Sequence, residues 1–154
     1  MAHYYLDSSA LVERYVSEAG TLWVDRLCDA ASGHTLYTVR VSAAEIIAAL
    51  FRRVRIGSLS LSDAQAQATQ FKADLVFDYH IIEVTGPVVD AAMALAEHHG
   101  LRRYDAIQLA GALELQKVLS ASGLPPLTFV CADTDLNTAA AAEGLPVEDP
   151  NSHP

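Results

Sequence analysis

The stretch that decides the fold of this chain is His3–Leu11, with the sequence H-Y-Y-L-D-S-S-A-L. Its first residues are apolar and aromatic, as is typical of a β-strand, and this run ends abruptly at Asp7. Two serines follow, and a helical pattern of apolar residues begins at Leu11. The stretch therefore predicts a strand-to-helix turn that carries a carboxylate. In an open α/β sheet such a turn lies at the carboxyl end of a strand, where ligand crevices form.

Outward from this turn, short strand-like runs alternate with helical patterns along the whole chain. Further strands are expected at Leu36–Val39, at His80–Val84, at Leu127–Cys131 and around Val147. Helices are expected at 8–18, 21–31, 42–57, 63–77, 86–99, 104–119 and from the turn at Asp133 to Glu143. This alternation predicts an α/β fold with a central, mostly parallel sheet of four to five short strands and helices on both faces. The helices at 42–57 and 63–77 are expected to form a hairpin that projects from the sheet.

Two of the expected helix starts match the capping-box pattern. Ser42-Ala43-Ala44-Glu45 reads S-x-x-E, and Ser62–Gln65 is a second candidate. In a capping box the acidic or amide residue bonds back to the start of its own helix. That role alone would explain Glu45.

The composition predicts one domain over residues 1–149, with residues 150–154 as a frayed tail. The chain has 154 residues, of which 51% are hydrophobic, and a mean hydropathy of +0.20, which is enough for a real core. It has no basic, apolar leader and no uninterrupted apolar run of about 18 residues. A soluble, cytoplasmic protein without membrane association is therefore expected. Cys28 and Cys131 lie far apart in apolar segments, so we expect buried thiols and neither a disulfide nor a zinc site.

The net charge limits the classes of partner. A formal charge of -9 argues against non-specific coating of nucleic acid, which rests on Lys and Arg contacts to phosphates. It does not exclude a small acidic site that recruits a divalent cation. It also favours a basic protein as partner.

Four acids lie in otherwise apolar or small-residue surroundings: Asp7, Glu45, Asp105 and Asp133. Asp7 and Asp133 each end an expected strand, Glu45 lies in the first turn of the helix after a strand, and Asp105 begins a largely apolar helix. The strand ends would bring Asp7, Glu45 and Asp133 to one edge of the sheet. Carboxylates gathered without matching lysines repel one another and lose hydration, and a hard divalent cation removes that cost.

Such a cluster is typical of a metal-dependent nuclease. Mg²⁺ prefers oxygen ligands and is held by one or two carboxylates directly, while others can hold its waters or a second ion. Two ions about 3.5–4 Å apart are a known arrangement for in-line phosphodiester cleavage. The acid cluster fits this chemistry better than that of a glycosidase.

Each of these residues also has a simpler structural explanation. Asp7 and Asp133 are suitable N-caps, and Asp105 would favour the positive end of its helix. Asp135 is either a fifth acid of the cluster or an exposed first-turn residue. His98 and His99 end a helix, where an imidazolium suits the dipole, so they are not assigned to catalysis.

At this point the chain resembles a known family over nearly its whole length. It is similar to PIN-domain ribonucleases, specifically the VapC-type toxins of VapBC toxin-antitoxin systems. The motifs that carry the resemblance are D-S-S-A-L at 7–11, S-A-A-E at 42–45 with L-F-R-R at 50–53, Y-D-A-I-Q-L-A at 104–110, and F-V-C-A-D at 129–133 with A-A at 139–140 and G-L at 144–145.

The resemblance implies a PIN-like three-layer α/β/α domain with a metal-dependent endoribonuclease site. On this basis Asp7, Glu45, Asp105 and Asp133 bind Mg²⁺ or Mn²⁺, and a metal-activated water attacks RNA to leave a 5′-phosphate and a 3′-hydroxyl. The resemblance also implies a cognate antitoxin protein as inhibitor, RNA as substrate and a homodimer.

The resemblance extends to supporting residues, with one departure. Ser9 matches the family's small hydroxyl residue, which would support the first acid or contact a phosphate. Many relatives have threonine two residues before the last acid, where this chain has Cys131, and Thr134 is the nearest substitute.

Three arginines are candidates for phosphate contacts. Arg52 lies seven positions after Glu45 and so on nearly the same helix face, and Arg102 and Arg103 precede Asp105. A solvated face or ordinary salt bridges would explain them equally well.

Other function classes fit less well. A phosphoacceptor receiver domain needs a lysine after a late strand, but Lys72 and Lys117 are the only lysines and both lie in expected helices. A haloacid-dehalogenase phosphatase needs an aspartate where Ser9 stands. The remaining alternative is a non-catalytic PIN-like module that binds RNA or protein.

Overall fold

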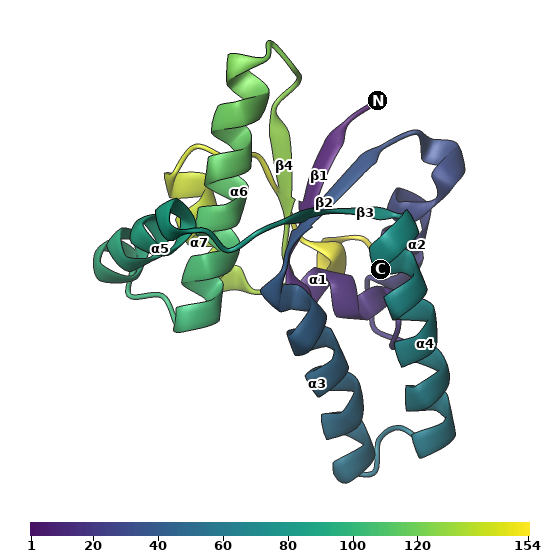
Figure 1. Ribbon diagram of the computed structural model, residues 1–154. Coiled ribbons are helices and arrows are strands. Elements are labelled where there is room, and N and C mark those ends of the chain that lie inside the picture. The colour runs from purple at the N-terminus through teal and green to yellow at the C-terminus, as the bar shows by residue number, and fades with distance from the viewer.

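A computed structural model of the chain describes all residues from Met1 to Pro154 and contains a single five-stranded sheet. All strand pairs are parallel, and the strand order is β3-β2-β1-β4-β5 (Figure 1). The strands are β1 (His3–Leu6), β2 (Thr35–Val39), β3 (Tyr79–Ile82), β4 (Leu127–Val130) and β5 (Val147–Glu148). The predicted parallel α/β architecture is confirmed.

Helices connect these strands and cover both faces of the sheet (Figure 1). They are α1 (Ser8–Leu11), α2 (Thr21–Cys28), α3 (Val41–Arg55), α4 (Leu61–Phe77), α5 (Gly86–His99), α6 (Arg103–Ala121) and α7 (Thr134–Ala142). Short 3-10 helices occupy Val12–Arg14, Ala30–Ser32 and Pro150–Ser152. The single helix expected over 8–18 is thus a short α-helix followed by a 3-10 turn.

The helical hairpin of α3 and α4 projects away from the sheet, as predicted (Figure 1). Its second helix is fixed to the body through Asp74, which is buried. The Tyr15 hydroxyl donates a hydrogen bond of 2.7 Å to Asp74, and Gln70 donates another of 2.7 Å. Arg14 lies 3.5 Å from the same carboxylate.

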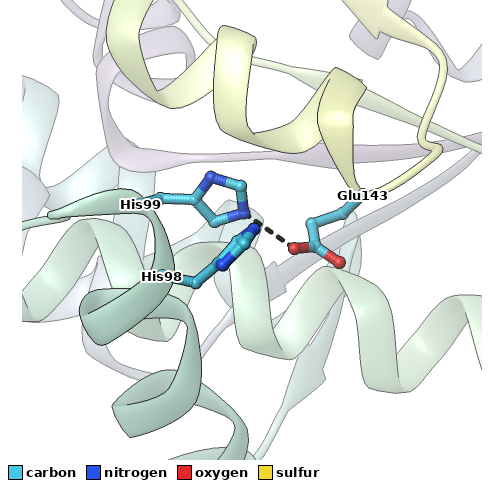
Figure 2. A group of neighbouring side chains, drawn as sticks. All are labelled: His98, His99 and Glu143. Carbon is cyan, nitrogen blue, oxygen red and sulfur yellow. Dashed lines mark hydrogen bonds and ion pairs between the residues drawn. The ribbon is translucent and has the colours of Figure 1, made fainter.

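The opposite face of the sheet carries α5, α6 and α7. Helix α5 packs along α6, and the last turn of α5 meets the end of α7. There His98, His99 and Glu143 turn toward one another (Figure 2).

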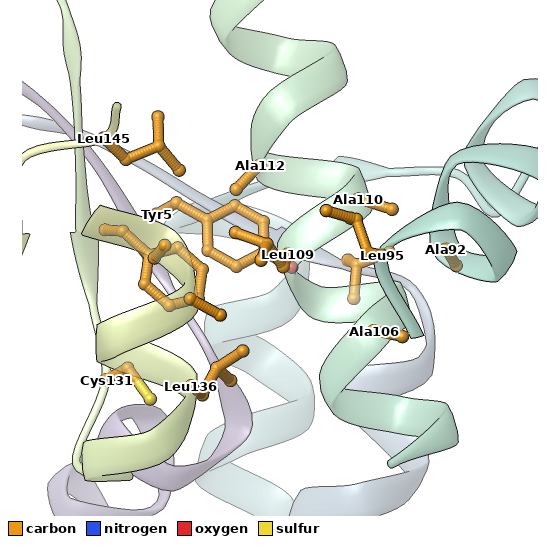
Figure 3. Packing of buried hydrophobic residues seen from close by; sticks show 14 of the residues in the cluster. Tyr5, Ala92, Leu95, Ala106, Leu109, Ala110, Ala112, Cys131, Leu136 and Leu145 are labelled. Carbon is orange, nitrogen blue, oxygen red and sulfur yellow. The ribbon is translucent and has the colours of Figure 1, made fainter. Parts of the chain in front are cut away.

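Two hydrophobic clusters form the core, one on each face of the sheet. Because neighbouring side chains of a strand point to opposite faces, Tyr5 and Phe129 enter the cluster with α5, α6 and α7, while Leu6 and Val130 enter the cluster with α1 to α4. The rings of Tyr5 and Phe129 stack with centroids 5.4 Å apart. Figure 3 shows Tyr5 packed near Leu109 of α6, with Cys131 and Leu136 lower in the same cluster.

Both cysteines are buried free thiols, as expected. The two capping-box predictions are wrong. Helix α3 begins one residue earlier than Ser42, whose hydroxyl is buried and accepts hydrogen bonds from Thr38 and Gln108. Ser60 caps α4, because its hydroxyl accepts from the backbone N–H of Asp63. Glu45 is therefore free of any capping role.

The residues after Asp149, expected to fray, are packed against the body. Asp149 caps the 3-10 helix Pro150–Ser152, and Pro150 is buried. The ring of His153 stacks on Trp23 with centroids 4.6 Å apart, and its Nε2 lies 2.9 Å from Glu148. The local sequence has no helical period here, but contact with α2 orders the segment.

None of the helices combines the length and apolar character needed to cross a membrane.

The packing of the C-terminal segment predicts the effect of Gly20→Ala. A Cβ at Gly20 would lie 2.3 Å from Glu13 Oε2 and 2.5 Å from Pro150 Cβ, with the Pro150 carbonyl carbon at 2.8 Å. We expect this overpacking to lower the free energy of unfolding by about 1–3 kcal/mol, measured by urea denaturation. Gly86→Ala is the matched control, because a Cβ there meets no atom within 4 Å. Equal stability of the two variants would contradict the packed arrangement of Pro150.

Candidate active site

The candidate site lies where the chain direction across the sheet reverses. Strand β1 has β2 on one side and β4 on the other. The chain leaves β1 toward the face of α1 and leaves β4 toward the face of α7. In open α/β sheets the crevice at the carboxyl ends of two such strands is the usual ligand site. Asp7 and Asp133 follow these two strands.

Asp7 is buried at the carboxyl end of β1, where it both caps α1 and belongs to the candidate site. Its Oδ1 accepts hydrogen bonds from Ser9 Oγ at 2.7 Å and from the Ala10 backbone N–H at 3.0 Å, so it caps α1 as well. Its side chain is 2% exposed. Burial raises the pKa of Asp7 to about 6, although these hydrogen bonds act in the opposite direction.

Cys131 and Ser9 tie the two strand ends together. The Cys131 thiol lies 3.3 Å from Asp7 Oδ2 and accepts from the Asp133 backbone N–H at 3.3 Å. The Ser9 hydroxyl accepts from the Ala132 N–H at 2.9 Å while it donates to Asp7. Burial and the neighbouring Asp7 charge raise the pKa of Cys131, so the thiol stays protonated as a donor. Cys131 therefore bridges the two strand ends as a hydroxyl would at this position.

Glu45 is held at the crevice by residues from two other elements. Ser8 Oγ donates to Glu45 Oε2 at 2.9 Å, and Gln108 Nε2 donates to Glu45 Oε1 at 3.0 Å. Burial raises the pKa of Glu45, the two hydrogen bonds lower it, and the Asp105 charge raises it, with a net increase. Because Ser8 follows Asp7 directly, this contact joins the start of α3 to the end of β1.

Asp105 and Asp133 complete the set of acids. Burial raises the pKa of Asp105, the Asp133 charge raises it further, and the Arg102 charge lowers it. Asp133 is exposed and caps α7 by accepting from the Leu136 N–H at 2.9 Å. The structure thus links all four predicted acids at the carboxyl ends of the strands. Cys131 contacts both Asp7 and the Asp133 backbone, and Ser8, which follows Asp7, holds Glu45. The charge of Asp105 acts on Glu45, and that of Asp133 acts on Asp105.

The donor set fits a hard divalent cation. None of the seven salt bridges of the chain involves these acids, and the one basic charge that acts on them is that of Arg102 on Asp105. No three of them have ligand atoms within 4.8 Å of one another. These acids therefore form a spread set of carboxylate oxygens, the ligand type that Mg²⁺ and Mn²⁺ take together with water.

The other predicted site residues make fewer contacts with the four acids. Arg102 is exposed beside Asp105, while Arg103 lies over the Tyr104 ring, 5.4 Å from its centroid. Arg52 is exposed near the end of α3, roughly 10 Å along the helix from Glu45. Thr134 and Asp135 are exposed in the first turn of α7.

Gln108 is the site residue to which sequence reasoning assigned no role. It is buried, and besides Glu45 it bonds to Ser42 Oγ at 2.9 Å and accepts from the Tyr5 hydroxyl at 2.7 Å. The available signal was a single amide among apolar neighbours, three positions after Asp105. Ser8 was missed in the same way, because its neighbour Ser9 matched the family motif.

Fold and site together define an α/β domain with a carboxylate site at the reversal point of a parallel sheet, the class in which acidic nucleases are found. The model of the PIN domain family matches residues 4–121. The chain belongs to the PIN domain family.

Relatives and solved structures agree with this assignment. Ribonuclease VapC45 from Mycobacterium tuberculosis strain CDC 1551 / Oshkosh and Ribonuclease VapC49 from strain ATCC 25618 / H37Rv are each 34% identical over 146 residues, which is 93% of this chain and 92% of theirs.

Among solved structures, PAE2754 from Pyrobaculum aerophilum superposes with a TM-score of 0.64 at 18% identity, over 98% of this chain and 92% of its own. FitAcB from Neisseria gonorrhoeae superposes with a TM-score of 0.61 at 17% identity, over 98% of this chain and 99% of its own. VapBC2 from Rickettsia felis, solved bound to a DNA fragment from the promoter, superposes with a TM-score of 0.60 at 16% identity. The match covers 95% of this chain and 97% of the VapBC2 chain. At these identities the structures support the fold alone.

The pKa of Asp7 predicts a pH dependence of stability in the metal-free protein. Between pH 3.8 and about 6 the folded chain keeps a proton on Asp7 that the unfolded chain has released. Stability therefore falls as the pH rises through this window, by roughly 3 kcal/mol at most. Asp7→Asn removes this pH-dependent loss of stability, because asparagine has no carboxyl proton to release. In chelator, the variant should be more stable than the native protein above pH 6, and the difference should shrink toward pH 4.

Urea denaturation at a series of pH values measures this effect. The matched control is Asp90→Asn, which changes an exposed aspartate of α5 and should shift stability by less than about 0.5 kcal/mol. If the free energies of unfolding of Asp7→Asn and the native protein differed by the same amount at every pH, the raised pKa of Asp7 would be contradicted.

Proposed function

We propose that this PIN-domain protein is a metal-dependent endoribonuclease and the toxin of a type II toxin-antitoxin pair. The observation that carries the proposal is the group of four acids, none of them in a salt bridge, at the β1/β4 reversal point. The curated relatives named as VapC ribonucleases support the reaction class over nearly the full chain.

In this proposal Asp7, Glu45, Asp105 and Asp133 hold Mg²⁺ or Mn²⁺. When bound, the cation supplies an activated water and neutralises charge at the scissile phosphodiester. The fit rests on the unpaired carboxylates, whose mutual repulsion a cation relieves.

The protein's own residues orient these acids. Ser9 and the Ala10 N–H fix one carboxylate oxygen of Asp7, while Cys131 lies against the other. Ser8 and Gln108 each hold one oxygen of Glu45. Of the three arginines, Arg102 is the best placed to contact an RNA phosphate, because it is exposed and its charge acts on Asp105.

The same proposal includes partners and location. The net charge of -9 favours an antitoxin that brings a basic side chain to the acidic crevice. The structural neighbour from Rickettsia felis is a VapBC2 assembly, which supports a toxin-antitoxin pairing here. We also infer a homodimer, which light scattering at micromolar concentration tests, and a cytoplasmic site of action, where RNA is available.

RNA cleavage is the direct test of the function. Purified, antitoxin-free protein should cut a labelled total-RNA pool into discrete fragments with Mg²⁺ or Mn²⁺ and leave it intact with chelator. Asp7→Asn and Asp105→Asn should each lower the rate by a factor on the order of 10² or more, because each removes a carboxylate from the donor set.

The control for this experiment is again Asp90→Asn, which should cleave at the native rate. Circular dichroism of each variant establishes that it is folded. Absence of cleavage by folded native protein with either metal would overturn the enzyme proposal and favour a non-catalytic PIN-like module that binds RNA or protein.

Gln108 leads to a finer prediction. Gln108→Leu keeps roughly the volume of the buried side chain but removes its hydrogen bonds to Glu45, Ser42 and Tyr5, so circular dichroism must first show that the variant is folded. We expect the cleavage rate to fall by about 10–100-fold, or the metal concentration that gives half-maximal activity to rise by the same factor. Gln65→Leu, on the exposed side of α4, is the matched control. A folded Gln108→Leu protein with the native metal requirement and rate would show that the site needs none of the Gln108 hydrogen bonds, the one to Glu45 included.

A further inference from the structure

A second group of metal-ligand side chains lies where α5 and α7 end, and it includes none of the four acids. His98 and His99 end α5, and Glu143 follows α7 as its C-cap (Figure 2). One ligand atom from each of these residues lies within 4.8 Å of the others. It is the one such group of His, Cys, Asp and Glu side chains in the chain.

The distances within this group are close to those of a coordination shell. His99 Nε2 lies 2.7 Å from Glu143 Oε1, and the His98 and His99 rings meet edge to face with centroids 4.5 Å apart. Ligand atoms around a tetrahedral Zn²⁺ at about 2.0–2.1 Å lie roughly 3.3 Å from one another. Small side-chain rotations at this partly exposed position would therefore bring the three ligands onto one ion.

The backbone around the group favours a cation. The C-terminal ends of α5 and α7 meet here, and each helix end carries a partial negative charge. Glu143 adds a full negative charge at the end of α7, where the helix dipole disfavours it. The ion-pair partner of Glu143 is His99, which is charged only when it is protonated. A bound cation would offset these negative charges at any pH at which the imidazoles are neutral.

The position is accessible to solvent and to an ion. His98 and Glu143 are exposed, and both line a surface cavity of about 580 Å³ between α5 and α6. The same cavity is lined by Glu114 and Lys117, which pair with each other at 2.6 Å. Lys117 is thus engaged with its own acid on α6.

We propose that His98, His99 and Glu143 form a binding site for a borderline transition-metal cation of the Zn²⁺ class. Two imidazole nitrogens and one carboxylate oxygen are a known zinc ligand set with the fourth position open to water. This mixed nitrogen and oxygen set differs from the oxygen-only set at the β1/β4 crevice, which suits Mg²⁺ or Mn²⁺. Binding would fasten the end of α5 to the end of α7.

Zinc binding in the presence of excess Mg²⁺ tests the proposal. With millimolar Mg²⁺ in all samples, calorimetric titration of the native protein with Zn²⁺ should show one site per chain. His99→Ala and Glu143→Gln should each weaken this site by a factor on the order of ten or more, because each removes a ligand. His80→Ala, which removes an exposed histidine of β3, should leave it unchanged.

A second measurement on the native protein does not depend on the folding of variants. Co²⁺ bound at this site should give visible absorption bands of a four-coordinate ion, and Zn²⁺ at about 100 times its Kd should raise the Tm by roughly 5–10 °C.

The outcomes separate this site from the proposed nuclease centre. Asp105→Asn should retain the zinc site, and neither readout requires RNA cleavage, so an inactive nuclease leaves the test intact. Native Zn²⁺ affinity in His99→Ala and Glu143→Gln, or loss of the site in Asp105→Asn, would overturn the proposal. So would native protein that takes up no Zn²⁺ in either measurement.

Discussion

The parallel pairing of β1 with β4 is the contact on which the candidate site depends. Its register sets Leu6 opposite Val130, and the Asp7 N–H continues the ladder by donating to the Val130 carbonyl. Asp7 therefore comes to lie beside Cys131 as the two strands end. Because the chain turns to opposite faces after these strands, the space beyond them stays open. A carboxylate held there is buried by its own strand and still borders a crevice.

The electrostatic cost of this arrangement is met locally by hydrogen bonds. Asp7 and Glu45 have raised pKa values mainly because burial removes water from their charges, and the Ser9, Ser8 and Gln108 donors offset part of that cost. The remaining cost is what a divalent cation would remove. A divalent cation bound at these acids would also stabilise the folded chain, because an ion that binds only the folded state favours that state.

Cys131 illustrates how geometry decides the role of a residue. The family resemblance predicts a hydroxyl at this position, and from the sequence alone a thiol suggests that the hydrogen bonds of that hydroxyl are lost. In the structure the thiol contacts both the Asp7 carboxylate and the Asp133 N–H, the two groups beside it at the ends of β1 and β4. Sulfur is a weaker hydrogen-bond donor than oxygen, and each of the two thiol contacts is 3.3 Å long. Thr134, the other residue that could supply a hydroxyl, is exposed in the first turn of α7.

Local sequence patterns were sufficient to predict the parallel sheet, the projecting hairpin and the candidate acids at strand ends, because strand and helix periods are local and parallel strands end at one edge. The hydrogen-bond partners of Glu45, the role of Gln108 and the packing of the C-terminal tail emerged only in the folded chain. Glu45 matched a capping box but bonds to Gln108, 63 residues away, and the tail is ordered by contact with α2. Such partners are set by the packing of distant elements, so no local pattern of side chains reveals them.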